Sequence, residues 1–209
     1  MRVRKKKWAA GELLDNPLII DKTDSSISDF FENPDFPLHL EVGCGKGRFI
    51  TKMSLLNPEI NFVALERDPT IVAHAARLAR ECGTKNIKFV ITDVDFIEDF
   101  IKPGDVCRLY INFCDPWPTK KKRARRRLTH DRYLEVYDKL KIPHIFFKTD
   151  NRFLFEFSVE SFSRCGWQIF NVSLDLHKSE YKDNIVTEYE ERFSVFGPIY
   201  RLEAKKTCG

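Results

Sequence analysis

Five short apolar runs alternate along the chain with segments of helical character, and this alternation most constrains the fold. The runs lie at residues 38–42, 62–65, 87–91, 107–113 and 145–147. Helical apolar spacing occurs between runs at residues 69–80 and 128–140, and again after the last run at residues 151–164. Strands that alternate with helices are typical of stacked βα units, in which helices cover a parallel sheet. The sequence therefore predicts an α/β fold.

The C-terminal part has a different pattern. Residues 167–176 and 192–203 both have the composition of strands, and the polar stretch at 177–190 between them shows no convincing helix. Successive strands without a crossover helix pair in antiparallel fashion. With the five earlier runs, these two give a mostly parallel, seven-stranded sheet that ends in an antiparallel strand pair.

The first residues of the chain are basic and show little apolar periodicity. Residues 1–16 are interpreted as a flexible basic arm, for which a solubilising tail and an RNA contact remain open, and residues 17–209 as one domain without repeats. No apolar stretch approaches the roughly 20 residues of a membrane span. The six cysteines form no C-x-x-C pair and the five histidines no H-E-x-x-H motif, so we expect a cytoplasmic protein without metal or membrane contact. The sequence leaves its oligomeric state open.

A glycine-rich loop follows the first predicted strand directly, with the pattern E-x-G-x-G-x-G at residues 41–47. Such a loop, at the carboxyl end of the first strand, is where open α/β sheets bind nucleotides. Arg48 stands where the dinucleotide fingerprint needs its last glycine, and the loop lacks the G-K-[ST] ending of a phosphate-binding loop. The Glu41 carboxylate would repel pyrophosphate but suits a sulfonium cation that bears an amino group. Gly43 and Gly45 would let the backbone approach that ligand closely.

Further acids follow the next two predicted strands. Glu66 ends the second strand, near where an acid binds ribose hydroxyls in nucleoside-binding α/β folds. Asp93 follows the third strand and could accept a hydrogen bond from an adenine amino group. Each acid alone is more simply a helix cap or a surface charge. Acids at three successive strand ends favour a nucleoside site.

The fourth predicted strand leads into a rigid turn, Asp115-Pro116-Trp117-Pro118. The prolines fix the backbone and the tryptophan offers a flat stacking face, which suits a flipped base. Seven basic residues then fall among eight positions: Lys120, Lys121, Lys122, Arg123, Arg125, Arg126 and Arg127. Beside a base pocket, phosphate binding is favoured over a solvated face or a targeting signal.

These segments, taken together with two later ones, resemble a known family. LEVGCGKG at 40–47, DPWP at 115–118 with RRL at 126–128, FKTDN at 147–151 and TEYE at 187–190 occur in this order. The combination is similar to the bacterial-type tRNA (guanine-N7-)-methyltransferases over about residues 38–193. The resemblance implies a Rossmann-like class I methyltransferase fold. It also implies transfer of a methyl group from S-adenosylmethionine to a guanine in the variable loop of tRNA.

The resemblance also implies roles for individual residues. The residues implied to line the cofactor site are Glu41, Glu66, Asp93 and Asp115, and those implied to meet the tRNA are Asp150, Thr187, Glu188, Tyr189 and Glu190. The family places a lysine directly after the D-P-W-P turn, but Thr119 stands there in this chain, so we assign the substrate-facing role to Lys120. Asp115 is also the expected catalytic residue, because a carboxylate stabilises the positive charge that the guanine ring gains.

Two alternative interpretations of the C-terminal motif remain. Thr187 and Glu190 are spaced as a capping box, which normally opens a helix. Because a strand is expected within a few residues, we favour substrate binding, in which the acids accept from the N–H groups of guanine.

Three functional alternatives also remain open. A methyltransferase of another RNA or of an amine substrate would more often carry a D-P-P-Y or N-P-P-Y turn. An inactive RNA-binding relative should have lost its acids, and a nicotinamide oxidoreductase should have a glycine at position 48.

Overall fold

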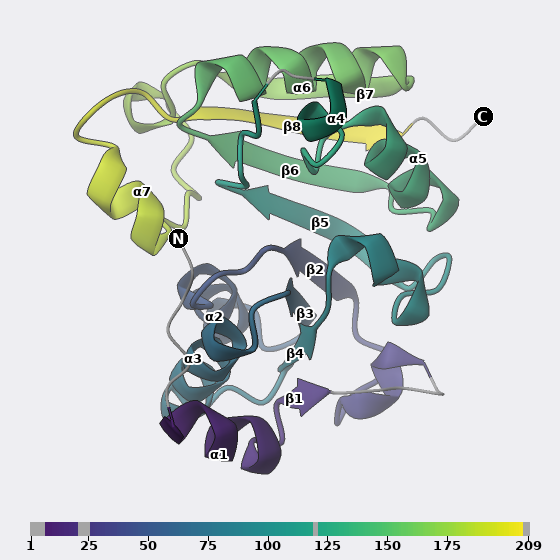
Figure 1. The fold of residues 1–209 in the computed structure, drawn as a ribbon, viewed down its shortest axis with the longest axis vertical. Coiled ribbons are helices and arrows are strands. Elements are labelled where there is room, and N and C mark those ends of the chain that lie inside the picture. The colour runs from purple at the N-terminus through teal and green to yellow at the C-terminus, as the bar shows by residue number, and fades with distance from the viewer. Residues whose placement is uncertain (1–6, 21–25, 119–120, 207–209) are drawn as a thin grey trace. The chain divides into compact units, whose positions relative to one another are not determined.

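The computed structural model describes residues 7–20, 26–118 and 121–206. These residues fall into two compact units, Met1–Val106 and Cys107–Gly209, called here the N-terminal unit and the C-terminal unit. Strand β5 begins at the boundary and is described with the C-terminal unit. Figure 1 shows the elements of each unit.

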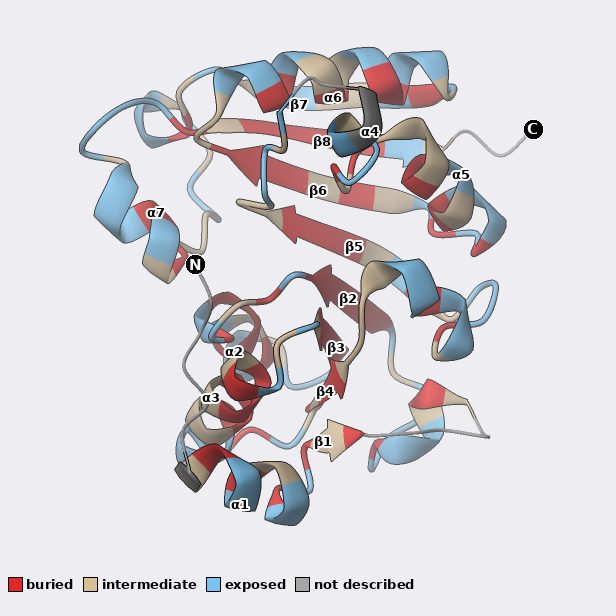
Figure 2. Cartoon of the chain, in the orientation of Figure 1, coloured by how far each residue is buried: buried red, intermediate tan, exposed pale blue. Residues whose placement is uncertain are grey.

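The N-terminal unit is built on parallel strands in the order β1-β4-β3-β2. Its strands are β1 (Ile19–Ile20), β2 (Leu38–Val42), β3 (Asn61–Glu66) and β4 (Ile87–Ile91). Its helices are α1 (Lys7–Asp15), α2 (Arg48–Leu56) and α3 (Pro69–Glu81), with short 3-10 helices at Ile27–Phe30 and Val94–Asp99. Every residue of β2 is buried, as expected for a parallel strand covered on both faces (Figure 2). The strands and the helix predicted in this region are confirmed within a few residues.

Helix α3 shows why the sequence folds as it does locally. The Asp68 side chain accepts hydrogen bonds from the backbone N–H groups of Thr70 and Ile71, and Pro69 occupies the first turn. Gly83 follows the helix with a φ of +74°, a conformation that favours glycine. These local signals fix both ends of the helix, and its alanines pack into the core.

The expectation of a flexible arm over residues 1–16 is wrong for its second half. Residues 1–6 lie outside the described residues, but α1 is a helix packed against α3. The buried Glu12 carboxylate binds Arg77 Nε at 3.1 Å and Arg80 Nη2 at 3.0 Å. The Arg77 guanidinium also lies 4.1 Å from the centre of the Trp8 ring. These contacts join residues far apart in the sequence, so apolar periodicity did not reveal them.

The C-terminal unit is built on strands in the order β5-β6-β8-β7, of which only β5 and β6 run parallel. Its strands are β5 (Val106–Asn112), β6 (His144–Thr149), β7 (Trp167–Ser173) and β8 (Tyr200–Lys206). Its helices are α4 (Lys121–Ala124), α5 (Asp131–Lys139), α6 (Arg152–Arg164) and α7 (Glu188–Phe193), with a 3-10 helix at Leu176–Lys178. Helix α6 packs against α5, β6, β7 and β8 and carries the buried Phe162.

The predicted α/β class, with mostly parallel strands and a terminal antiparallel pair, is confirmed. Two details differ. The described residues contain eight strands because the two-residue β1 adds a partner to β4. The strand expected at 192–203 begins only at Tyr200, and helix α7 occupies residues that were expected to be loop and strand. With six residues, α7 is too short for apolar periodicity to distinguish it from a loop.

Candidate functional site

The glycine loop joins β2 to α2 in the N-terminal unit. Its three glycines, Gly43, Gly45 and Gly47, have φ values of +72°, +54° and +75°, which side chains rarely adopt. At Gly47 the close packing of α3 adds a second constraint, because a Cβ there would lie 2.7 Å from the Ala75 Cβ atom. Gly47 is therefore required for the packing of the loop against α3.

Gly43 and Gly45 have a different environment. A Cβ at either position would meet no atom of the described residues within 4 Å, so both glycines present bare backbone to open space there. The N–H of Gly43 donates to the Leu65 carbonyl oxygen at 2.8 Å, which ties the loop to the end of β3. The loop is thus held in place by β3 while one side stays accessible. This arrangement suits a ligand that approaches the backbone closely.

The carboxylate of Glu66 lies against this loop. Its Oε2 accepts from the Gly45 N–H at 3.3 Å, and its Oε1 accepts from the N–H groups of Arg67 at 2.9 Å and Asp68 at 3.1 Å. Each carboxylate oxygen can accept two hydrogen bonds, so Oε2 keeps capacity for a ligand hydroxyl. The three donors hold the carboxylate at the loop, where the ribose interpretation requires it.

Glu41 lies near the end of β2, and Cys44 lies within the loop that follows. Glu41 is only 2% exposed. Burial, followed by the negative charges of Glu41 and Glu66, raises the pKa of the Cys44 thiol well above its ordinary value. The thiol therefore stays protonated near neutral pH, and Cys44 is a packing residue rather than a nucleophile.

Asp93 follows β4 and caps the short 3-10 helix at Val94–Asp99. Its side chain accepts a hydrogen bond from the Asp95 N–H at 3.2 Å. The capping role that the sequence allowed is therefore present in the structure. Contact with an adenine amino group stays a prediction.

We expect Glu66→Ala to weaken the binding of S-adenosylmethionine by about 1.5–3 kcal/mol, because a charged hydrogen-bond acceptor is lost. Isothermal titration calorimetry measures the affinity. Glu81→Ala removes an exposed acid at the end of α3 and serves as the matched control. Equal affinities in the wild type and Glu66→Ala would exclude Glu66 from the binding site.

In the C-terminal unit, the turn after β5 has unusual backbone geometry. Phe113 and Trp117 have φ values of +50° and +24°, although neither is glycine. The buried Arg127 side chain holds the turn: its Nε donates to the Pro116 carbonyl oxygen at 2.8 Å, and its Nη2 donates to that of Trp117 at 2.7 Å. Strained residues that surrounding contacts hold in place are common at functional sites.

Asp115 is an exposed residue of this turn, so its side chain does not hold the core together. The neighbouring Cys114 thiol is different, because burial raises its pKa to about 12. Two adjacent residues therefore differ in environment: Cys114 is a packing residue, whereas Asp115 faces solvent.

The basic run after the turn divides into two groups. Arg123, Arg125 and Arg126 are exposed, as a phosphate-binding role requires. Arg127 was expected to join them but is committed to the carbonyl oxygens of the turn, so it is a structural residue. Lys120, the predicted substrate-facing lysine, lies outside the described residues.

We expect that changing Arg123, Arg125 and Arg126 together to glutamine will weaken tRNA binding and flatten its salt dependence. Each lost phosphate contact should reduce the slope of log K against log salt by about 0.7–0.9. Filter binding at several salt concentrations measures this slope. A triple change of the exposed Lys52, Lys85 and Lys102 to glutamine is the control. The same slope in the arginine variant and the wild type would show that the run is a solvated surface.

The T-E-Y-E segment opens helix α7, which corrects the preference against the capping box. Thr187 accepts from the Glu190 N–H at 3.0 Å, and Glu190 accepts in return from the Thr187 N–H at 3.3 Å. Strand β8 begins only at Tyr200, so the chain has room for the helix.

The carboxylate of Glu190 is completely buried and fully engaged within the chain. Lys148 Nζ binds its Oε2 at 2.6 Å, and Asn184 Nδ2 donates to its Oε1 at 2.6 Å, with His177 Nε2 3.0 Å from the same oxygen. Lys148 Nζ also donates to the Asn184 side chain at 3.0 Å and to the Ile185 carbonyl oxygen at 2.8 Å. These contacts assign Glu190 to holding α7 on β6 rather than to presenting its acid to a ligand.

Tyr189 and Asp150 are brought together by this anchoring. The Tyr189 hydroxyl donates to Asp150 Oδ2 at 3.1 Å, and the exposed part of the tyrosine faces solvent. Burial, and then the negative charge of Asp150, raises the pKa of the Tyr189 hydroxyl. Two motifs that are almost 40 residues apart thus meet after β6, as the substrate interpretation requires.

Sequence reasoning did not identify Lys148 and Arg127 as the residues that position these segments. A lysine within the apolar strand FFKT was the available signal for Lys148, because a buried ammonium group requires acceptors. Arg127 could not be distinguished among seven neighbouring cations.

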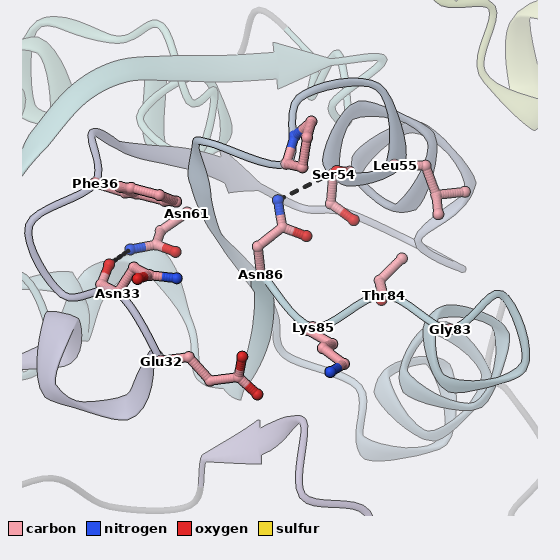
Figure 3. A pocket seen from close by; sticks show the side chains of 11 residues that line it. Glu32, Asn33, Phe36, Ser54, Leu55, Asn61, Gly83, Thr84, Lys85 and Asn86 are labelled. Carbon is pink, nitrogen blue, oxygen red and sulfur yellow. Dashed lines mark hydrogen bonds between the residues drawn. The ribbon is translucent and has the colours of Figure 1, made fainter.

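A cavity of about 290 Å³ lies elsewhere in the N-terminal unit (Figure 3). It opens between Asn61, which starts β3, and Asn86, which precedes β4, at the amino ends of these strands. The Asn86 Nδ2 atom donates to three backbone carbonyl oxygens, including that of Ile60 at 2.7 Å. The glycine loop follows the opposite, carboxyl end of β2, so this cavity is separate from the predicted cofactor site.

Among the described residues, no group of three or more histidine, cysteine or acidic side chains could hold a metal ion. None of the helices in the described part combines the length and apolar character that a membrane crossing requires.

Comparison with solved structures shows the fold. A structure described as an antibiotic related methyltransferase is similar with a TM-score of 0.58 and 19% identity, covering 88% of this chain and 94% of the other. A magnesium protoporphyrin IX methyltransferase from Synechocystis PCC 6803, solved with bound SAM, has a TM-score of 0.57 and 12% identity, with 82% and 71% covered. The parallel strands, the glycine loop and these likenesses define a Rossmann-like methyltransferase fold.

Sequence comparison then establishes the family. Residues 35–201 match the family described as "Putative methyltransferase". The tRNA (guanine-N(7)-)-methyltransferase of Listeria monocytogenes serovar 1/2a is 44% identical over 212 aligned positions, which cover 98% of each chain. The chain belongs to the family of tRNA (guanine-N(7)-)-methyltransferases.

Proposed function

We propose that this protein transfers a methyl group from S-adenosylmethionine to N7 of a guanine in the variable loop of tRNA. Membership in the tRNA (guanine-N(7)-)-methyltransferase family is the observation that carries this proposal. The contact of Tyr189 with Asp150 supports it, because an acid and an aromatic ring side by side suit the N–H edge and the face of a guanine. Residues 17–209 act as one methyltransferase domain together with helix α1, which packs against α3, and the family match across both units supports this.

The cofactor fits the residues of the glycine loop. Gly43 and Gly45 offer open backbone, and Glu66 offers a fixed carboxylate for the ribose hydroxyls. Glu41 and Asp93 supply further acids for the amino group and the adenine, and Asp115 is a cofactor contact as well as the catalytic residue. When bound, S-adenosylmethionine supplies an electrophilic methyl group on a sulfonium centre.

The chemistry of guanine N7 sets what the chain must contribute. This nitrogen carries a lone pair and no proton, so no side chain has to act as a general base. The guanine ring becomes more positive as the methyl group arrives, and the Asp115 carboxylate stabilises that charge. The remaining work is to position the base, which we assign to Asp150, Thr187, Glu188, Tyr189 and Lys120. Glu190 contributes by holding α7. We place the reaction in the cytoplasm, on tRNA and without metal.

The test combines labelled cofactor with two tRNA transcripts. One transcript contains guanosine, and the other is made with 7-deazaguanosine, which has carbon in place of N7. We expect 7-methylguanosine on nucleoside analysis of the first transcript and no label in the second. Label in the deaza transcript, or a different methylated nucleoside in the first, would identify a methyltransferase of another atom or substrate. No label in either would favour an inactive RNA-binding relative.

A further inference from the structure

We propose that four aromatic residues form a stacking platform for unpaired bases of the RNA next to the methylated guanine. The residues are Phe113, Tyr189, Phe193 and Phe196, called here the aromatic ladder. This inference rests on the proposed function and adds a binding subsite to it. Phe113 lies two residues before Asp115, and Tyr189 and Phe193 belong to α7, which is labelled in Figure 1. Phe196 follows three residues after the end of this helix.

The rings of the ladder follow one another at stacking distances. The ring centres of Phe113 and Tyr189 are 5.0 Å apart, those of Tyr189 and Phe193 are 4.2 Å apart, and those of Phe193 and Phe196 are 6.2 Å apart. Tyr189 and Phe193 are stacked, with 24° between their planes. The first and last of these distances fall within the usual range of aromatic pairs, and the stacked pair of Tyr189 and Phe193 is slightly closer. The series extends the aromatic surface outward from the substrate motif.

The outer rings of the ladder are open to solvent. Tyr189 is 41% exposed and Phe193 is 37% exposed, while Phe196 is 80% exposed beside the equally open Val195. Phe196 therefore contributes little to the core of the C-terminal unit. Contiguous exposed aromatic rings in a folded protein mark an interaction surface.

The charges on α7 favour bases over phosphates as the occupant. The helix carries glutamates at positions 188 and 191 and a single arginine, Arg192. The acids repel the phosphate backbone, whereas every base offers a face that can stack on a ring. The ladder is also continuous with Tyr189 and Asp150, where the proposed function places the target guanine. Bases adjacent to that guanine are thus the occupant that fits.

The inner part of the platform is anchored by contacts within the chain. The buried pair of Glu190 and Lys148 fixes α7 to β6, and Lys148 Nζ also lies 5.7 Å from the centre of the Phe113 ring. A preformed platform loses little conformational entropy when a base stacks on it.

The experiment uses a tRNA with 2-aminopurine on either side of the methylated guanine, because stacking quenches the fluorescence of this base. Phe196→Leu keeps an apolar side chain but removes the flat ring, and Phe196→Trp keeps a stacking face. Phe153→Leu changes another exposed phenylalanine, on α6, and is the matched control. Methylation kinetics, cofactor affinity and sedimentation of each variant complete the measurement.

We expect Phe196→Leu to lose quenching and to bind tRNA about 5- to 100-fold more weakly, the loss typical of one stacked base. Its cofactor affinity and the slope of its salt dependence should stay unchanged, while Phe196→Trp and Phe153→Leu should behave like the wild type. If Phe196→Leu quenches 2-aminopurine and binds tRNA like the wild type, with methylation intact, the stacking role of the ladder is wrong while the proposed function stands. A change of sedimentation without loss of tRNA binding would overturn it in favour of a second copy of the chain. Absence of methylation by the wild type would instead overturn the proposed function and the ladder with it.

Discussion

Asp115→Ala is expected to fold like the wild type and to lose about 10²- to 10³-fold in kcat. The fold should persist because Arg127 holds the turn through the backbone carbonyl oxygens of Pro116 and Trp117, and Asp115 is exposed rather than part of the core. The rate should fall because a preorganised charge that stabilises the transition state is typically worth this factor. Single-turnover methylation of tRNA measures the rate, and thermal unfolding checks the fold.

Asp115→Asn separates the contribution of charge from that of a hydrogen bond that Asp115 would accept from the guanine base. Asparagine keeps a hydrogen-bond acceptor but removes the charge, so activity near that of Asp115→Ala would show that charge is the main contribution. Activity near the wild type would show that hydrogen bonding to the base is the main contribution. Asp183→Ala removes an exposed acid from another loop and is the control. A wild-type rate in Asp115→Ala would contradict the proposed catalytic role.

The strands and long helices could be predicted because their signals are local. Apolar runs mark the strands from β2 to β7, and capping residues such as Asp68 mark helix ends within a few positions. The acids at the ends of β2 and β3 and just after β4 could also be placed, since parallel strands bring their carboxyl ends to one edge. The positions of the predicted cofactor residues in the N-terminal unit followed from this topology.

The remaining features depend on contacts between distant residues. Helix α1 is fixed through Glu12 to arginines more than 60 positions away. The spacing of apolar residues along the chain cannot indicate a contact between residues so far apart. Likewise, the acids of T-E-Y-E look equivalent in the sequence, yet Glu190 is buried against Lys148 of β6 while Glu188 is half-buried. The buried member of the motif could therefore be recognised only from the structure.

Lys148→Met is expected to lower the free energy of unfolding by about 3–5 kcal/mol, the cost of leaving one partner of a buried ion pair without the other. The side chain of Lys148 is 7% exposed and that of Glu190 is not exposed, so water cannot replace the lost ammonium group. Chemical denaturation measures the effect. Arg164→Met breaks a more exposed ion pair, with Asp131, and should cost less than about 1 kcal/mol.

A double-mutant cycle tests whether the effect belongs to this pair. Glu190→Gln alone should also destabilise the protein, because it leaves the Lys148 ammonium facing a neutral amide. The double variant with Lys148→Met and Glu190→Gln should lose less stability than the sum of the single variants, since neither charge is then buried alone. Because α7 carries Tyr189 toward Asp150, Lys148→Met should also raise KM for tRNA while cofactor affinity stays unchanged. Additive losses in the cycle would show that the two side chains contribute independently, and the anchoring role assigned to this pair would then be wrong.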